Sequence, residues 1–242
     1  KALGTVRKVV ASYPLGWMSQ RLETAGNKQA GWRTDPRRCG PAGCLIDLGI
    51  HCFYLTEWVV GLSVSEVCAD LRPTVAGRIL DDDCSVLVRF STGARGMFLA
   101  SQIATGKTEG LSLRVYGDKA ALNWAQSKPD QLILTGLDGK RQRITDGPPA
   151  EDMAGITTLT PYGNNTAYIA ALASAYRSFA DTLEKTKNKN PNVPPIFMSV
   201  EEGLRTVAFV DAVIRNTAQP AEEGVPPPAK WMPLVVPPVP EL

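Results

Sequence analysis

The sequence predicts an α+β fold in which an open, predominantly antiparallel β-sheet has its helices packed on one face. One helix-forming segment is followed by seven short runs of alternating or β-branched character, and two amphipathic helices come after them. Short turn-forming links, such as Ser91-Thr92-Gly93, join the runs and favour hairpins, hence antiparallel pairing. A regular strand–helix alternation does not occur, which argues against a doubly wound nucleotide-binding fold.

The first part of the chain reads as one strand, one loop and one helix. Residues 6–11 form a short β-rich run, and residues 12–38 are loop-like. Pro41 suits the first turn of a helix and Gly61 suits its end. This pair predicts one helix over residues 41–60.

Seven further strands and two helices account for most of the remainder. The strands are predicted at residues 63–71, 85–90, 95–103, 111–116, 121–124, 131–135 and 141–144. Helices are predicted at residues 166–185 and 200–217, where apolar residues recur at helical spacing. We expect the Pro-rich tail, residues 224–242, to be an extended segment packed on the surface.

Length and composition favour a single domain over residues 1–242 and exclude several partners. A hydrophobic content of 44% supports a sizeable core. The formal net charge is only +2, so no basic field is available to bind nucleic acid. No apolar run approaches the ~20 residues needed to cross a bilayer, so no membrane association is expected.

The cysteines indicate a reducing compartment. Their number is five, and they lack the spacing of a disulfide framework, which predicts free thiols and a cytoplasmic location. Cys39, Cys44 and His51 lie near one another in the sequence. Because no second close pair completes a tetrahedral set, we expect no metal site.

Two nucleotide-binding motifs are missing. The chain contains no G-x-G-x-x-G, the fingerprint of a dinucleotide-binding domain. Residues 105–108, Thr-Gly-Lys-Thr, resemble the end of a phosphate loop, but the position that requires the first glycine is Ser101. A β-hairpin is therefore expected at this place.

The one histidine of the chain stands in the segment CLIDLGIHCF, residues 44–53. Asp47 and His51 are four residues apart, so on a helix they project from the same face. The apolar surroundings are typical of a buried segment, where a carboxylate and an imidazole could pair for hydrogen-bonding alone. The alternative is a general acid/base, since imidazole titrates near neutrality and a carboxylate can orient it.

Residues 40–51, Gly-Pro-Ala-Gly-Cys-Leu-Ile-Asp-Leu-Gly-Ile-His, resemble the G-G-x-x-x-D-x-G-x-H segment of the Gfo/Idh/MocA oxidoreductases. Further segments that are similar to this family lie at residues 31–36, 86–90, 93–94, 113–124 and 199–203. The resemblance covers nearly all of the chain.

That resemblance implies a particular place in a longer protein. The family joins an N-terminal Rossmann domain to a C-terminal α+β domain with an open sheet, and this chain is similar to the second domain only. The missing glycine fingerprint and the start without methionine agree with this interpretation. We therefore expect a dinucleotide-binding domain of ~120 residues upstream.

The resemblance also implies an activity, in which a hydride moves between NAD or NADP and a sugar, a polyol or a related compound. His51 and Asp47 fall on the family's catalytic histidine and aspartate. His51 would exchange a proton with the substrate, and Asp47 would orient substrate and imidazole. The family's catalytic lysine belongs to the absent domain, so this chain alone is expected to be inactive.

Further binding residues follow from the same resemblance. Trp32 and Arg33 match positions that reach the cofactor in some members, and a guanidinium suits phosphate or carboxamide oxygens. Tyr168 matches a tyrosine near the cofactor or substrate. Tyr13 and Trp17, in the loop-like stretch, are candidates for stacking on a sugar. For each of them the alternative is a packing role.

The sequence thus predicts the substrate-binding and oligomerisation domain of a cytoplasmic NAD(P)-dependent oxidoreductase. The alternative is a non-catalytic dimerisation or sugar-binding module of the same fold. Alternation in one strand places Val86 and Val88 on one sheet face and Leu87 on the other. Apolar residues on both faces favour a homodimer or homotetramer through the open face.

Overall fold

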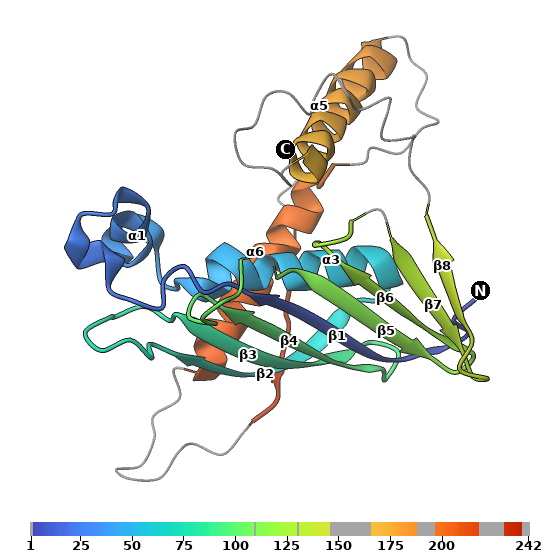
Figure 1. Cartoon of the computed structure of the whole chain (residues 1–242), viewed down its shortest axis with the longest axis horizontal. Coiled ribbons are helices and arrows are strands. Elements are labelled where there is room, and N and C mark those ends of the chain that lie inside the picture. Colours follow the sequence, from blue (N-terminus) through green and yellow to red (C-terminus); the bar gives the residue numbers. More distant parts are fainter. Residues whose placement is uncertain are drawn as a thin grey trace. The chain divides into compact units, whose positions relative to one another are not determined.

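A computed structural model describes residues 2–108, 110–129, 131–145, 166–187, 197–217 and 230–238. Its centre is a nine-stranded sheet with the order β8-β7-β6-β5-β1-β4-β3-β2-β9 (Figure 1). The strands are β1 Val6–Pro14, β2 Val64–Arg72, β3 Asp83–Phe90, β4 Arg95–Ser101, β5 Ser112–Gly117, β6 Ala120–Ala125, β7 Leu132–Gly136, β8 Arg141–Ile144 and β9 Met232–Pro233. The predicted α+β fold with an open, mostly antiparallel sheet is confirmed.

One parallel pair interrupts the antiparallel sheet. The first strand, β1, lies between β4 and β5, parallel to β4 and antiparallel to β5. The hairpin expected around residues 105–108 is therefore wrong, because the two strands that flank it are not neighbours. The N-terminal strand β1 lies between β4 and β5. The short segment that links β4 to β5 carries no signal for a strand inserted from elsewhere in the sequence.

The helices agree with the sequence except near the N-terminus. They are η1 Leu22–Ala25, α1 Lys28–Arg33, α2 Pro36–Cys39, the π-helical turn η2 Leu45–Gly49, α3 Ile50–Val60, α5 Thr166–Lys187 and α6 Val200–Thr217. The loop expected over residues 12–38 is wrong, since it holds the end of β1 and three short helices. Two of these helices have N-cap signals: Asn27 accepts from the backbone N–H of Gln29 and of Ala30, and Asp35 accepts from that of Arg37, whereas η1 has no side-chain cap.

The helix predicted at residues 41–60 begins later than expected. Pro41 lies before the helical segment, which starts at η2 and continues into α3. The predicted end is confirmed: Gly61 has a left-handed φ of 64°, and its N–H donates to the carbonyl of Glu57.

The described chain forms two compact units. One consists of Lys1–Ile144 with Leu204–Leu242, and the other of Thr145–Gly203. The sheet, α3 and most of α6 belong to the first unit, whereas α5 belongs to the second.

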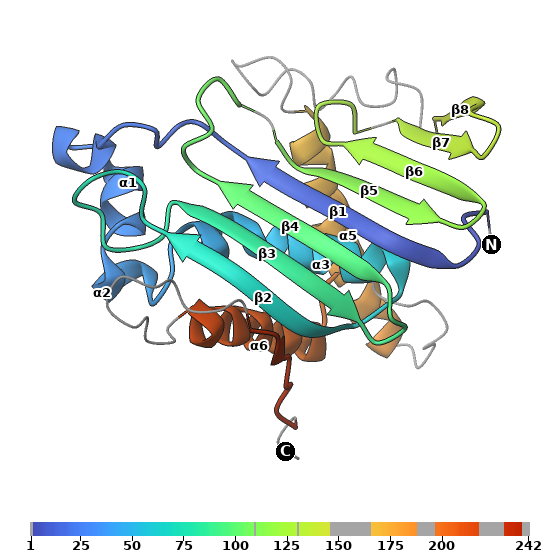
Figure 2. The ribbon, with the colours of Figure 1, turned by 90° about the horizontal axis from the view of Figure 1, so that it is seen from below.

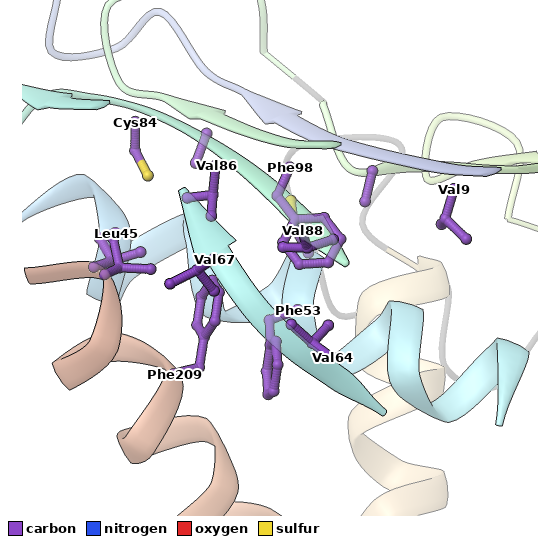
Figure 3. Close-up of a cluster of buried hydrophobic side chains, with 14 of the residues drawn as sticks. Val9, Leu45, Phe53, Val64, Val67, Cys84, Val86, Val88, Phe98 and Phe209 are labelled. Atoms are coloured by element: carbon purple, nitrogen blue, oxygen red, sulfur yellow. The ribbon is translucent and has the colours of Figure 1, made fainter. Parts of the chain in front are cut away.

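The core of the first unit lies between the sheet and the two helices α3 and α6 (Figure 3). Phe209 of α6 stacks on Phe53 of α3 with ring centroids 4.3 Å apart, and its ring meets that of Phe98 in β4 edge-on at 6.1 Å. Val86 and Val88, which the alternation of β3 places on this face, are buried beside them. Apolar burial against α3 and α6 thus fixes which face of the sheet points inward.

Among the described residues, no helix or strand covers the opposite face of the sheet (Figure 2). Leu87 and Met97 are cross-strand neighbours on β3 and β4, and Met97 is in turn opposite Val10 on β1. Leu87 is 47% exposed and Met97 is 37% exposed. An apolar row therefore crosses the middle of the open face.

The end of the chain returns to the edge of the sheet. Strand β9 pairs with β2, and the side chain of Asn216 at the end of α6 bridges the two segments. Its amide donates to the carbonyl of Lys230 at 2.7 Å, while its oxygen accepts from the N–H of Ala69 at 2.8 Å. Of the predicted tail, residues 230–238 are described and Met232–Pro233 form a strand; the rest lies outside the described residues.

Two observations bear on the environment of the chain. All five cysteines are free. Within the described part of the chain, no helix is both long enough and apolar enough to cross a membrane.

Candidate functional site

Apart from Tyr168, the predicted site residues gather where the parallel strands β1 and β4 end. Tyr13 is opposite Ala100 in this pair, and the chain segments that follow both strands continue side by side. Backbone hydrogen bonds join them, from Leu15 N to the Ser101 carbonyl at 2.7 Å and from Met18 N to the Gln102 carbonyl at 3.0 Å. The loop that carries Trp17 is therefore fixed to the end of the sheet.

The helical segment that carries Asp47 and His51 starts at a buried carboxylate. Asp81, which precedes β3, accepts from the N–H of Gly43 at 2.6 Å and from that of Leu45 at 2.8 Å. A Cβ on Gly43 would lie 2.5 Å from the Asp81 carbonyl oxygen, so only glycine allows this approach. The close approach to the Gly43 backbone is therefore made by another part of the same chain.

The carboxylate of Asp47 is held by two donors. Arg33 Nε lies 3.2 Å from both of its oxygens, and Gln102 Nε2 donates to Oδ2 at 2.9 Å. Asp47 and Arg33 are both only partly exposed, so their charge pair is incompletely screened. Gln102, which is buried, was missed in the sequence. Its one signal was a polar residue directly after an apolar strand.

Arg33 connects the predicted catalytic and cofactor residues. Its guanidinium carbon lies 4.1 Å from the ring centre of Trp32 and 5.6 Å from that of Trp17, within cation–π range. Its Nη1 donates to Gln29 Oε1 at 2.8 Å. The structure thus places both indoles, this arginine and Asp47 in one cluster.

His51 lies at the surface, so the expectation of a buried histidine is wrong. Its ring meets that of Tyr13 edge-on, with the centroids 5.7 Å apart. Although the side chain is exposed, the surrounding protein desolvates the imidazole and lowers its pKa, and the nearby Asp47 charge opposes this shift. The hydrogen-bond partners of Asp47 are Arg33 and Gln102, so its influence on His51 is electrostatic.

The other predicted site features are placed only in part. Tyr168 lies on α5, in the second unit, and its side chain is outside the described residues. In the part of the chain that the structure describes, no group of three His, Cys, Asp or Glu side chains could hold a metal ion.

Fold and site together define an open-sheet α+β domain with a carboxylate and an imidazole one helical turn apart, beside the ends of two parallel strands. A family model described as the GFO/IDH/MocA C-terminal domain matches residues 1–123, half of the chain. The chain belongs to this family.

Known proteins agree with this assignment. The uncharacterized oxidoreductase YfiI of Bacillus subtilis (strain 168) is 23% identical over 222 residues, which cover 90% of this chain and 56% of that protein. The structure of an oxidoreductase from Sinorhizobium meliloti is 30% identical in sequence and has a TM-score of 0.71. The match covers 95% of this chain and 57% of that protein. The chain therefore spans a little over half the length of these relatives.

Other solved structures share the fold. An inositol dehydrogenase homolog from Azotobacter vinelandii, complexed with NAD⁺, has a TM-score of 0.77 at 24% identity and covers 96% of this chain and 58% of its own. Levoglucosan dehydrogenase, complexed with NADH and levoglucosan, has a TM-score of 0.70 at 20% identity. The match covers 97% of this chain and 60% of that protein.

Proposed function

We propose that this chain is the C-terminal substrate and oligomerisation domain of a longer NAD(P)-dependent oxidoreductase that acts on a sugar, a polyol or a related compound. The observation that carries the proposal is the pair of Asp47 and His51 beside the ends of β1 and β4. The family and the greater length of the relatives support it. So do the NAD⁺ complex of the inositol dehydrogenase homolog and the levoglucosan complex of levoglucosan dehydrogenase, two proteins with the same fold.

In this proposal His51 is the general acid/base. A nicotinamide cofactor, held mainly by an upstream domain, would supply the hydride chemistry at the substrate carbon. During oxidation the substrate hydroxyl loses its proton to the His51 imidazole as the carbonyl forms, and in reduction the ring returns it. The desolvation of His51 keeps more of the ring neutral at a given pH, which suits it to accept that proton.

Asp47 keeps a negative charge beside the imidazole. The Arg33 guanidinium and the Gln102 amide orient its carboxylate. The charge stabilises the imidazolium that forms during substrate oxidation, so Asp47 assists the proton transfer without carrying the proton itself.

The aromatic residues around the pair have binding roles in the proposal. Tyr13 and Trp17 would stack on the substrate, because both flank the end of β1 and the Tyr13 ring touches that of His51. Trp32 and Arg33 would contact the cofactor through an indole face and a guanidinium, groups that suit a planar ring and phosphate oxygens. Tyr168 remains a cofactor candidate from the resemblance alone.

The open face of the sheet would join copies of the chain. The row formed by Val10, Met97 and Leu87 offers apolar surface that a second copy could cover, giving a homodimer or homotetramer. The free cysteines support a cytoplasmic location for the assembly.

The test is an assay of the parent protein, the longer polypeptide that contains this chain. Reduced nicotinamide should form when NAD⁺ or NADP⁺ is mixed with one of a panel of inositols, anhydrosugars and aldoses. Asp47→Asn should lower kcat while leaving the protein folded. If no member of the panel is oxidised but a sugar still binds, the non-catalytic module is the better account.

A further inference from the structure

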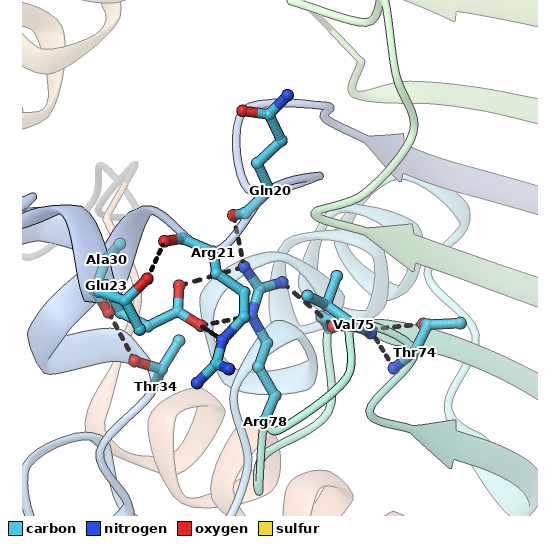
Figure 4. Close-up of polar contacts among 10 residues, drawn as sticks. Gln20, Arg21, Glu23, Ala30, Thr34, Thr74, Val75 and Arg78 are labelled. Atoms are coloured by element: carbon cyan, nitrogen blue, oxygen red, sulfur yellow. Dashed lines mark hydrogen bonds and ion pairs between the residues drawn. The ribbon is translucent and has the colours of Figure 1, made fainter.

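A buried ion network joins the two segments that make up the candidate site. One segment is the arm, residues 15–39, which carries Trp17, Trp32 and Arg33. The other is the site helix, residues 44–60, which carries Asp47 and His51. The network is centred on Arg78 in the link between β2 and β3 (Figure 4).

Arg78 is a fully buried cation with partners on both sides. Its side chain is 1% exposed. Toward the arm, its Nε donates to Glu23 Oε1 at 3.1 Å, and its Nη2 donates to the Gln20 carbonyl at 2.8 Å. Toward the sheet, its Nη1 donates to Asp82 Oδ2 at 3.1 Å. A single guanidinium thus ties η1 of the arm to the start of β3.

The next residue along the chain links this network to the site helix. Asp82 binds Arg78 on one side, while its neighbour Asp81 caps the first N–H groups of the site helix on the other. The Asp82 carbonyl also accepts from the N–H of Gln102 at 2.9 Å, and Gln102 in turn donates to Asp47. The dipeptide at 81–82 therefore holds both the arm and the site helix in place.

The arm depends on polar contacts for its place. Among its residues, all of which are described, the buried apolar side chains are those of Met18 and Ala30. Burial alone would raise the pKa of Glu23, but its hydrogen bonds and the Arg78 charge lower it overall, so the carboxylate is held as an anion in the network. Backbone hydrogen bonds hold the start of the arm to the sheet, and Arg33 holds its end to Asp47. Between these points the arm buries little apolar surface, so the part around η1 should open easily once its ionic anchor is removed.

We propose that Arg78, held by Asp82, is a positioning residue that fixes the arm beside the site helix and thereby sets the geometry for ligand binding. Arg78 acts through the arm and does not touch substrate or cofactor. Its kinetic role rests on the proposed function, because that function makes the arm a binding element. A complementary role follows for Asp81, which positions the reacting helix itself.

The two positioning groups predict different kinetic signatures in the parent protein. Arg78→Met should lower kcat/KM by about 10- to 100-fold, with KM raised because the arm binds the ligands and kcat lowered as well because Arg33 of the arm orients Asp47. Asp81→Asn should lower kcat, because the new amide turns a donor toward the N–H groups of Gly43 and Leu45. Arg78→Lys keeps the charge without the forked geometry and should fall between Arg78→Met and the unaltered protein.

Arg205 supplies a matched control. Its guanidinium also binds both oxygens of one carboxylate, that of Glu57, and a backbone carbonyl, that of Val64. This second ion cluster joins α3, β2 and α6 and does not include the arm. Arg205→Met should therefore lower the melting temperature while leaving kcat/KM within about threefold of the unaltered protein.

Hydrogen exchange of the 242-residue chain tests the anchoring without any catalysis. In Arg78→Met, amides of residues 20–30 of the arm should exchange at least about tenfold faster, and those of residues 204–217 should not change. Arg205→Met should show the reverse pattern. Unchanged arm exchange in both Arg78 variants would overturn the proposal, as would a loosened arm with unaltered KM in an active parent protein. If the parent protein proves inactive, the exchange data still decide the anchoring claim.

Discussion

Replacing Phe209 with alanine should remove a central contact between α6 and the rest of the core. The side chain is 0% exposed, stacked on Phe53 and edge-on to Phe98. Buried phenylalanine-to-alanine changes cost about 3–5 kcal/mol, which includes the cavity left behind. Each lost aromatic pair adds about 0.5–1.5 kcal/mol. We expect a loss near the top of the first range, a third or more of the ~5–15 kcal/mol typical of a domain.

The assay is urea unfolding followed by tryptophan fluorescence. All five tryptophans lie in the unit formed by residues 1–144 and 204–242, so the signal reports on that unit alone. Val207 is exposed on the same helix, so Val207→Ala should change the unfolding free energy by no more than about 0.5 kcal/mol. A loss below about 1.5 kcal/mol for Phe209→Ala, at an unchanged m-value, would refute the packing described for α6.

Three further predictions concern the site and the assembly. The imidazole of His51, followed by NMR, should titrate below the ordinary histidine pKa, and Asp47→Asn should lower this pKa further. Because the unfolded state has the higher pKa, it binds more protons than the folded state between the two pKa values. The free energy of unfolding should therefore rise with pH across this range. The isolated chain should show negligible affinity for NAD(P)H by calorimetry. Micromolar binding would contradict the proposal that an upstream domain holds most of the cofactor. Light scattering should find a dimer or larger assembly that Met97→Arg dissociates, whereas Val207→Arg should not; a monomer in both the unaltered chain and the controls counts against the open-face interface.

The elements with strong periodicity could be predicted from the sequence. The alternation of β3 identified Val86 and Val88 as core residues and Leu87 as a residue of the other face, and burial bears this out. Helix α6 was predicted with its observed bounds. In these segments one apolar face meets one core, so local pattern and tertiary packing agree.

The supports of the site could not be predicted in the same way. Gln102, Asp81 and Arg78 each have a partner 36 to 58 residues away in the sequence, a separation that no local sequence pattern reveals. The exposure of His51 was also missed, because an apolar composition does not reveal which helix face points away from the core. The three short helices of the arm were overlooked, since each is shorter than the window in which helical periodicity can be recognised.

The most direct test of the proposed activity is kcat against pH for His51→Asn in the parent protein, with the melting temperature as control. Because His51 is exposed, the substitution should leave the melting temperature nearly unchanged. Loss of a positioned proton carrier should lower kcat by about 10²–10⁴-fold and remove the pH dependence that the imidazole imposes. A folded His51→Asn protein with full turnover and an unaltered pH profile would contradict the assignment of the acid/base.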